Sequence, residues 1–123
     1  MLKILLIDDD ETEYHLIKRM MQDCYDGPYI LRYSPTLKKA ISTLQNEDID
    51  VILLDDKLGK GQTAQTTVPG LKDVAHSIPM IVISSAIDAA YLKDKTILNV
   101  YDIVDKYHLR EKIAAGILSE TNP

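Results

Sequence analysis

The sequence predicts an α/β three-layer sandwich of the (βα)5 type, in which a parallel five-stranded sheet lies between two layers of helices. Its 123 residues suit a single domain spanning 1–123. Five short apolar runs recur along the chain, and four are almost continuous in Ile, Leu and Val, as in strands covered on both faces. Segments with helical spacing separate the runs, and this alternation favours right-handed crossovers in one sheet.

The apolar runs place the five predicted strands. The second run, Tyr-Ile-Leu-Arg-Tyr, is more mixed than the others and is typical of an edge strand. The strands are expected at residues 4–7, 29–33, 51–54, 80–83 and 100–104. We expect the strand order 2-1-3-4-5.

The first two predicted helices place apolar residues three and four positions apart, on one face. These residues are Tyr14, Ile17, Met21 and Cys24 in the first helix, and Leu37, Ala40, Ile41 and Leu44 in the second. Gly27-Pro28 ends the first helix, and Ser34-Pro35 precedes the second.

The remaining helices are less regular. Pro69-Gly70 interrupts the third apolar face, so we expect a loop through about residue 69 and then a short helix. A fourth short helix is expected at residues 87–95. The last helix carries Leu109, Ile113 and Ile117, and is expected to end before Asn122-Pro123.

Composition excludes several classes of protein. Fourteen basic and nineteen acidic residues give a net charge of −5, which disfavours direct binding to nucleic acid or to an anionic membrane surface. The longest aliphatic runs have four residues, whereas a membrane span needs about 20. A secretory signal is not recognisable either. We therefore expect a cytoplasmic protein.

Cysteine and histidine offer no metal site. The single Cys24 excludes an internal disulfide framework and a cysteine-rich zinc site, and a buried thiol is expected there. His15, His76 and His108 lack the spacing of metal ligands, and we expect structural or surface roles for them.

Polar residues follow four of the predicted strands. Asp8 and Asp9 follow the first strand, Asp55 the third, Ser84 the fourth and Lys106 the fifth. In a sheet ordered 2-1-3-4-5 the first and third strands are neighbours where the order reverses, and ligands bind at such points. The three aspartates should therefore converge.

This combination of residue types favours phosphoryl transfer. Clustered carboxylates repel unless a cation or a proton offsets their charge, and oxygen ligands alone favour Mg²⁺. A lysine and a hydroxyl suit phosphoryl oxygens. Because the chain has no glycine-rich phosphate loop, a carboxylate itself is the expected nucleophile, which gives an aspartyl phosphate.

Taken together, the motifs KILLIDDD, DVILLD, PMIVISS and YDIVDK resemble the receiver domain of two-component response regulators, a flavodoxin-like fold, over nearly the whole chain. The family's acid pair falls on Asp8 and Asp9, and its phospho-acceptor on Asp55. Its Thr/Ser falls on Ser84 and its lysine on Lys106. Each motif alone is weak, but in this order, each after a strand, they are specific.

The resemblance implies roles for these residues. Mg²⁺ would be held by Asp9, Asp55 and the backbone carbonyl of Lys57, with Asp8 acting through water. Asp55 would take a phosphoryl group from a phosphohistidine, and Lys106 would neutralise its oxygens. The Ser84 hydroxyl would bind the phosphoryl product and shift the face formed by the fourth helix and fifth strand.

The resemblance also implies partners. They are a histidine kinase or phosphotransfer protein, and a fused or separate output domain; a homodimer through the fourth helix, fifth strand and fifth helix is compatible with it. The domain would be a self-phosphorylating signalling module and not a turnover enzyme. We expect no direct contact with nucleic acid or membrane, and no effector within residues 1–123.

Two loop positions depart from the family pattern. Gly59 and Thr63 stand where the family often has proline and glycine, so the loop 59–63 should be more mobile. Tyr107 follows the lysine, where the family usually has a cis proline. Since a non-proline cis peptide costs about 2.5–4 kcal/mol, the bond is either trans, with an altered loop, or strained.

Further departures concern the output of the domain. Ile103 replaces the family's aromatic switch residue, and strand parity places Tyr101 on the same face as a substitute. Ser85 replaces the usual alanine. Of the other acids, Asp10 is expected to serve only the start of a helix and Asp56 to be solvated or a weak modifier of the site.

Three functions follow from these observations. The first is an active receiver that phosphorylates Asp55. The second is a pseudo-receiver that binds partners constitutively, as the Ile103 and Tyr107 departures suggest. The third, a flavodoxin-like enzyme or cofactor binder, is disfavoured because acids follow the first strand, where they would repel a cofactor phosphate.

Overall fold

The computed structural model describes residues 1–59, 61–75 and 77–121. Predictions that involve Lys60, His76, Asn122 and Pro123 fall outside these ranges. The strands are β1 (Leu2–Ile7), β2 (Tyr29–Ser34), β3 (Val51–Asp55), β4 (Met80–Ser84) and β5 (Asp102–Asp105). The α-helices are α1 (Glu11–Cys24), α2 (Leu37–Asn46), α3 (Ala64–Ala75), α4 (Lys95–Leu98), α5 (Leu109–Ala114) and α6 (Ile117–Glu120). Two 3₁₀ turns are η1 (Ala90–Leu92) and η2 (Lys106–His108).

The sheet confirms the predicted topology. Its five strands pair in the order β2-β1-β3-β4-β5, and all four pairings are parallel. β2 lies at one edge, as its mixed composition predicts, and its exposed Arg32 pairs with Glu47 at 2.8 Å. β5 forms the other edge, with only four residues and an aspartate at each end, Asp102 and Asp105.

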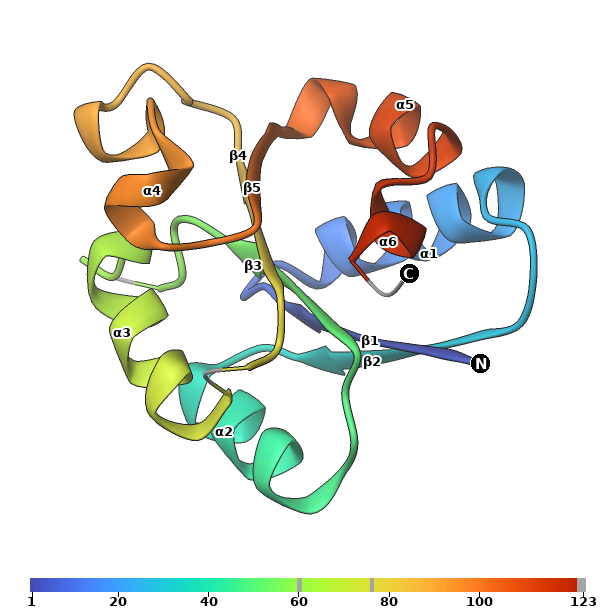
Figure 1. The fold of residues 1–123 in the computed structure, drawn as a ribbon, viewed down its shortest axis with the longest axis horizontal. Helices are drawn as coiled ribbons and strands as arrows, with labels where there is room; N and C mark the ends of the chain where they lie inside the picture. Colours follow the sequence, from blue (N-terminus) through green and yellow to red (C-terminus); the bar gives the residue numbers. More distant parts are fainter. Residues whose placement is uncertain (60, 76, 122–123) are drawn as a thin grey trace.

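Alternate strand residues pack on opposite faces, so the apolar runs form two cores. Figure 1 shows the helices that lie on the two sides of the sheet. The α3-side core contains Leu5, Ile7, Ile52 and Leu54 and is covered by α2, α3 and α4. The α1-side core contains the intervening residues, such as Leu53, and is covered by α1, α5 and α6. The apolar runs are therefore almost continuous, because the residues on both faces of the sheet are buried under helices.

The first two helices begin where side chains cap them. Asp10 accepts a hydrogen bond from the Thr12 N–H at 2.9 Å, which confirms its expected place at the start of a helix. Thr36 caps α2 through the Lys39 N–H at 3.1 Å. The predicted inward residues Ile17, Met21 and Ala40 are buried.

The prediction for the third helix is wrong, because α3 begins at Ala64 and contains Pro69 in its interior. Val68, Leu71 and Ala75 are all buried on one face, so packing offsets the hydrogen bond that proline cannot donate. α3 packs against α2 near Gly70, where a Cβ would make an ordinary van der Waals contact of 3.9 Å with Leu37 Cδ2.

The two later helices also differ from expectation. Instead of one helix at 87–95, the chain forms η1 and then α4, which Asp94 caps through the Thr96 N–H at 2.9 Å. The last helix is broken at Gly116, whose φ of +95° is left-handed and separates α5 from α6. Its predicted core residues Leu109 and Ile113 are nevertheless buried.

Tyr101 does not share a face with Ile103, contrary to the parity prediction. Ile103 packs on the α3-side core, whereas Tyr101 packs on the α1-side core and donates a hydrogen bond to Glu120 Oε2 at 3.2 Å. Strand parity fails because β5 begins only at Asp102, so Tyr101 precedes the extended segment.

Two further sequence expectations are tested by the described residues. Cys24 is only half-buried, and Arg110 Nη1 lies 3.4 Å from its Sγ, so the thiol is not the buried one predicted. His15 and His108 are exposed and lie next to Glu11 and Glu111, consistent with surface roles. Over these residues no helix combines the length and apolarity that crossing a bilayer requires.

Candidate functional site

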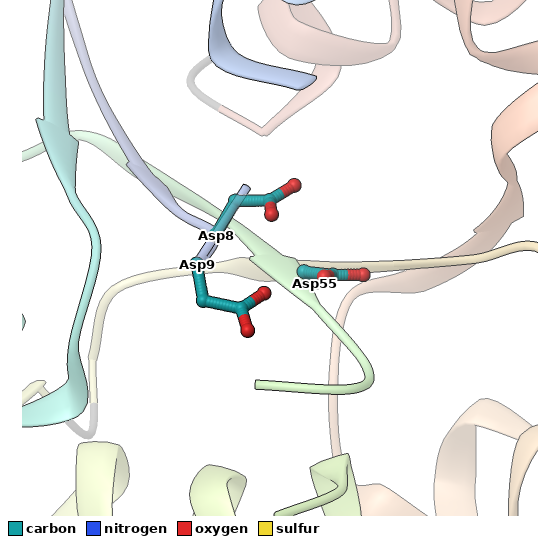
Figure 2. Close-up of side chains that lie close together, drawn as sticks. All are labelled: Asp8, Asp9 and Asp55. Atoms are coloured by element: carbon teal, nitrogen blue, oxygen red, sulfur yellow. The ribbon is translucent and has the colours of Figure 1, made fainter. Parts of the chain in front are cut away.

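The strand ends bring Asp8, Asp9 and Asp55 together, and we name these residues the acid cluster (Figure 2). Asp8 directly follows β1 and Asp55 is the last residue of β3, and these strands are paired with Ile7 opposite Leu54. One carboxylate oxygen from each residue lies within 4.8 Å of the others. Asp8 and Asp55 are buried, whereas Asp9 is exposed.

Backbone N–H groups fix two of these carboxylates. The Asp10 N–H donates to Asp8 Oδ1 at 2.9 Å, and the Gly59 N–H donates to Asp9 Oδ2 at 3.1 Å. Gly59 has a φ of +72°, a conformation that other residues adopt only with strain. The departure from proline at this position therefore allows the loop to reach Asp9.

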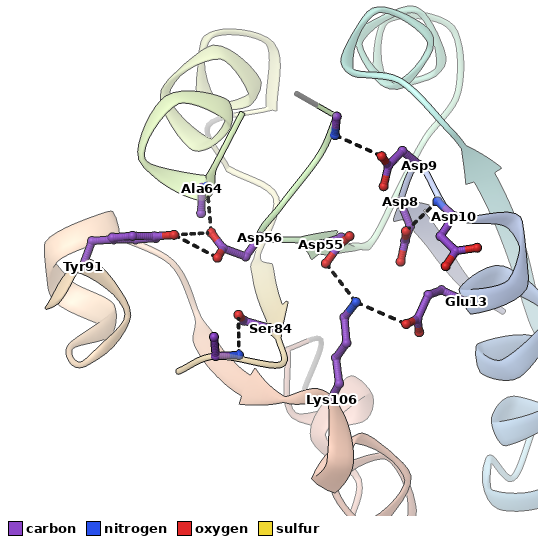
Figure 3. Close-up of polar contacts among 12 residues, drawn as sticks. Asp8, Asp9, Asp10, Glu13, Asp55, Asp56, Ala64, Ser84, Tyr91 and Lys106 are labelled. Carbon is purple, nitrogen blue, oxygen red and sulfur yellow. Dashed lines mark hydrogen bonds and ion pairs between the residues drawn. The ribbon is translucent and has the colours of Figure 1, made fainter. Parts of the chain in front are cut away.

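Lys106 reaches the acid cluster from the end of β5 (Figure 3). Its Nζ lies 3.2 Å from Asp55 Oδ1 and 3.3 Å from Glu13 Oε1. The Lys106–Tyr107 peptide is trans, since no peptide of the described residues is cis, and Asp105 accepts from the Tyr107 N–H at 3.0 Å. The altered-loop alternative is thus the one adopted, with Tyr107 81% exposed.

Glu13 is a neighbour that sequence reasoning missed. It is the third residue of α1, and its carboxylate is only partly exposed beside Lys106. A signal was present in the helical spacing, because Glu13 lies four residues before the buried Ile17 and therefore on the inward side of the helix.

Asp8 and Asp55 are hard to ionise in the absence of a cation, because burial raises the pKa of each. Burial raises the pKa of Asp8 from 3.8 to about 7; the bond from Asp10 opposes this, and the charge of Asp55 adds to it. Burial also raises the pKa of Asp55, although Lys106 opposes the shift. Burial by itself would lower the pKa of Lys106, but Asp55 and Glu13 raise it, so the lysine is held as a cation.

Ser84 lies at the same end of the sheet, but it is not bonded to the acid cluster. It is buried at the end of β4, and its Oγ accepts a hydrogen bond from the Ala86 N–H at 3.1 Å (Figure 3). Lys57 is exposed in the segment after β3, and its carbonyl remains a predicted ligand. The sheet thus places four of the predicted side chains close together, with Ser84 beside them.

Asp56 is buried, which corrects the expectation that it is solvated. It is only 1% exposed, and its carboxylate accepts hydrogen bonds from the Ala64 N–H at 2.9 Å and from the Tyr91 hydroxyl, at 3.0 and 2.9 Å to its two oxygens. Alternation along the strand explains this, because Asp56 shares the parity of Leu54 and so faces the α3-side core. Through these hydrogen bonds Asp56 holds the first residue of α3 and a residue of η1 together.

The donor set fits Mg²⁺ better than a soft metal. The grouped ligand atoms are all carboxylate oxygens, and a divalent cation would offset the charge that the buried acids carry once they ionise. The adjacent lysine suits the oxygens of a phosphoryl group. The arrangement can therefore hold a cation and an anion next to the same carboxylate.

Comparisons with known proteins agree on one family. The family model described as the response regulator receiver domain matches residues 4–117. The transcriptional regulatory protein DcuR of Escherichia coli K12 is 35% identical over 108 residues, which cover 86% of this chain and 44% of that protein. The chain thus spans less than half the length of the curated relatives it matches.

Solved structures agree on the fold. The receiver domain of Francisella response regulator 1452 has a TM-score of 0.79 at 19% identity, with complete coverage of both chains. The receiver domain of the Pseudomonas aeruginosa PAO1 sensor histidine kinase PA1611, which has a magnesium ion in its active site cleft, has a TM-score of 0.78 at 16% identity. That alignment covers 97% of this chain and 95% of the other.

Proposed function

Because the chain belongs to the response regulator receiver family, we propose that Asp55 accepts a phosphoryl group from a phosphohistidine of a histidine kinase or phosphotransfer protein. Family membership makes the domain a signalling module of a two-component system rather than a turnover enzyme. The observation that carries the proposal is the 3.2 Å contact of Lys106 Nζ with Asp55 Oδ1, within the acid cluster.

Asp9, Asp55 and the Lys57 carbonyl would hold Mg²⁺, with Asp8 acting through water. When bound, the ion supplies positive charge that neutralises the oxygens of the transferred group. The grouping of the three carboxylates supports this assignment, as does the cost of leaving Asp8 ionised without a cation.

In the transfer step a carboxylate oxygen of Asp55 attacks phosphorus and forms a new O–P bond. The P–N bond to the imidazole breaks, and its electron pair stays on the imidazole nitrogen. Lys106 then contacts an oxygen of the transferred group. Ser84 would release its bond from Ala86 in order to donate its hydroxyl to the same group.

Intact-mass measurement tests the proposal directly. Incubation with acetyl phosphate and Mg²⁺ should add one phosphoryl group to the protein, and Asp55→Asn should abolish the gain. The exposed Asp48 provides a matched control, since Asp48→Asn removes an equal charge elsewhere on the surface. A folded protein that gains no phosphoryl group would contradict the proposal.

A pseudo-receiver is the second candidate, favoured by Ile103 on the α3-side core and by the bond of Ser84 to its own loop. In that case Asp55→Asn would leave partner binding unchanged and the wild-type mass would not increase. We also propose that residues 1–123 form one receiver domain that works with a fused or separate output domain.

A further inference from the structure

Glu13 is a carboxylate beside the site that has no place in the phosphoryl-transfer scheme above. Its Oε1 lies 3.3 Å from Lys106 Nζ, the same ammonium that lies 3.2 Å from Asp55 Oδ1. The Lys106 and Glu13 side chains are 23% and 28% exposed. The ammonium is therefore shared between a carboxylate of α1 and a carboxylate of β3 (Figure 3).

The shared contact reduces the charge that Lys106 can offer to a phosphoryl group. A divalent cation would offset the acid cluster, but Glu13 is not a member of that cluster. Its negative charge acts instead on Lys106, and it repels an approaching phosphate. Lys106 must also give up part of its contact with Glu13 before it can follow the phosphoryl oxygens.

Glu13 also lies where a small phosphoryl donor would approach the site. It faces an open groove that Lys106 shares. The groove is lined by Glu13, Leu16, Met20, Ser85, Lys106 and Tyr107. A donor that enters beside Lys106 therefore passes a carboxylate that Lys106 neutralises only in part, because the same ammonium also contacts Asp55.

We propose that Glu13 is a positioning residue that restrains Lys106 and slows phosphorylation of Asp55 by anionic small-molecule donors. This inference rests on the proposed function, because it concerns the rate of the same transfer. It predicts that neutralising Glu13 speeds the reaction, whereas loss of an ordinary structural contact would slow it or leave it unchanged.

The experiment compares Glu13→Gln with Glu11→Gln in the same first turn of α1. Glu11 is 78% exposed and pairs with His15, so its variant removes an equal charge without touching Lys106. With acetyl phosphate, Mg²⁺ and low salt, Glu13→Gln should raise the phosphorylation rate about 3- to 10-fold, and Glu11→Gln by less than about 2-fold. Intact mass over time gives both rates.

Two further measurements separate an electrostatic effect from a structural one. The acceleration should be smaller with phosphoramidate, which carries a smaller net negative charge than acetyl phosphate, and it should shrink in about 1 M salt. In metal-free protein, NMR relaxation of the Lys106 ε-methylene should show greater mobility in Glu13→Gln than in Glu11→Gln.

The outcomes are distinguishable. If wild type is phosphorylated and Glu13→Gln is no faster, or Glu11→Gln is equally accelerated, the role of Glu13 is refuted while the proposed function stands. If none of the folded proteins gains a phosphoryl group, the proposed function fails and this inference fails with it.

Discussion

Asp55 and Asp56 are consecutive buried aspartates with opposite surroundings. Asp55 points to the α1 side, where it meets two other carboxylates and the shared ammonium of Lys106. Asp56 points to the α3 side, where the Ala64 N–H and the Tyr91 hydroxyl bind its two oxygens. One peptide unit therefore separates a carboxylate with excess negative charge around it from one whose hydrogen bonds are satisfied.

The difference teaches how one strand end can serve both chemistry and stability. A carboxylate among like charges is costly until a cation arrives, so relief of that repulsion can contribute to binding the cation. A carboxylate bound by protein donors has already used its acceptors to hold the fold. Each prediction below changes one side of this comparison.

The largest effect is expected from Asp56→Ala. The substitution leaves the Ala64 N–H and the Tyr91 hydroxyl without their acceptor, which should lower the free energy of unfolding by about 2–4 kcal/mol. Urea denaturation followed by circular dichroism measures it.

Asp55→Asn is the control for this change, because burial already disfavours the charge at that position. It should leave the stability of the metal-free protein unchanged or raised. Equal stability losses in Asp56→Ala and Asp55→Asn would remove the contrast between the two aspartates.

Asp8→Asn should stabilise the metal-free protein in a pH-dependent way. The unfolded chain ionises Asp8 near 3.8, whereas the folded chain retains the proton up to about 7. Ionisation therefore favours unfolding across this window, and wild type loses stability as pH rises through it. The variant should be more stable by roughly 1–3 kcal/mol at pH 8 and nearly equal to wild type near pH 4.

Thermal unfolding in EDTA across this pH range tests the prediction, with Asp48→Asn as an exposed control. Adding Mg²⁺ should stabilise wild type, since an ion that binds only the folded state raises its stability. The difference in stability between Asp8→Asn and wild type should therefore become smaller. A pH-independent difference would mean that the charge of Asp8 is not its cause.

The smallest effect is expected from Tyr91→Phe, which removes one donor to Asp56 but keeps the ring and the Ala64 bond. A loss of about 0.5–1.5 kcal/mol is expected. Tyr107→Phe is the matched control, because that side chain is 81% exposed and should tolerate the change. If both variants unfold like wild type, the hydroxyl of Tyr91 contributes nothing.

The convergence of the acid cluster with Lys106 could be predicted, because these residues lie at or just after strand ends and the expected strand order brings those ends to one edge of the sheet. The roles of these residues stay predictions. Features that depend on contacts across the sheet were not foreseen. Pro69 is tolerated inside α3 because the helix buries one face against the sheet. The Pro-Gly pair in the sequence predicts a helix end, and it does not show that packing would offset its effect.

Two omissions could have been avoided. The parity of β3 already directs Asp56 toward the same side as Leu54, and the spacing of α1 places Glu13 in line with Ile17. The identity of their partners could not be found this way. Tyr91 and Lys106 come from segments 35 and 93 residues away, which only the folded chain brings near.

The two edges of the sheet bear on how the protein behaves at high concentration. An unpaired edge strand can recruit a strand from another molecule, and such pairing begins aggregation. β5 has only four residues, of which the first and last are aspartates, and β2 carries Arg32, which pairs with Glu47. Repulsion at one edge and a bulky ion pair at the other would each hinder the addition of a strand from another molecule.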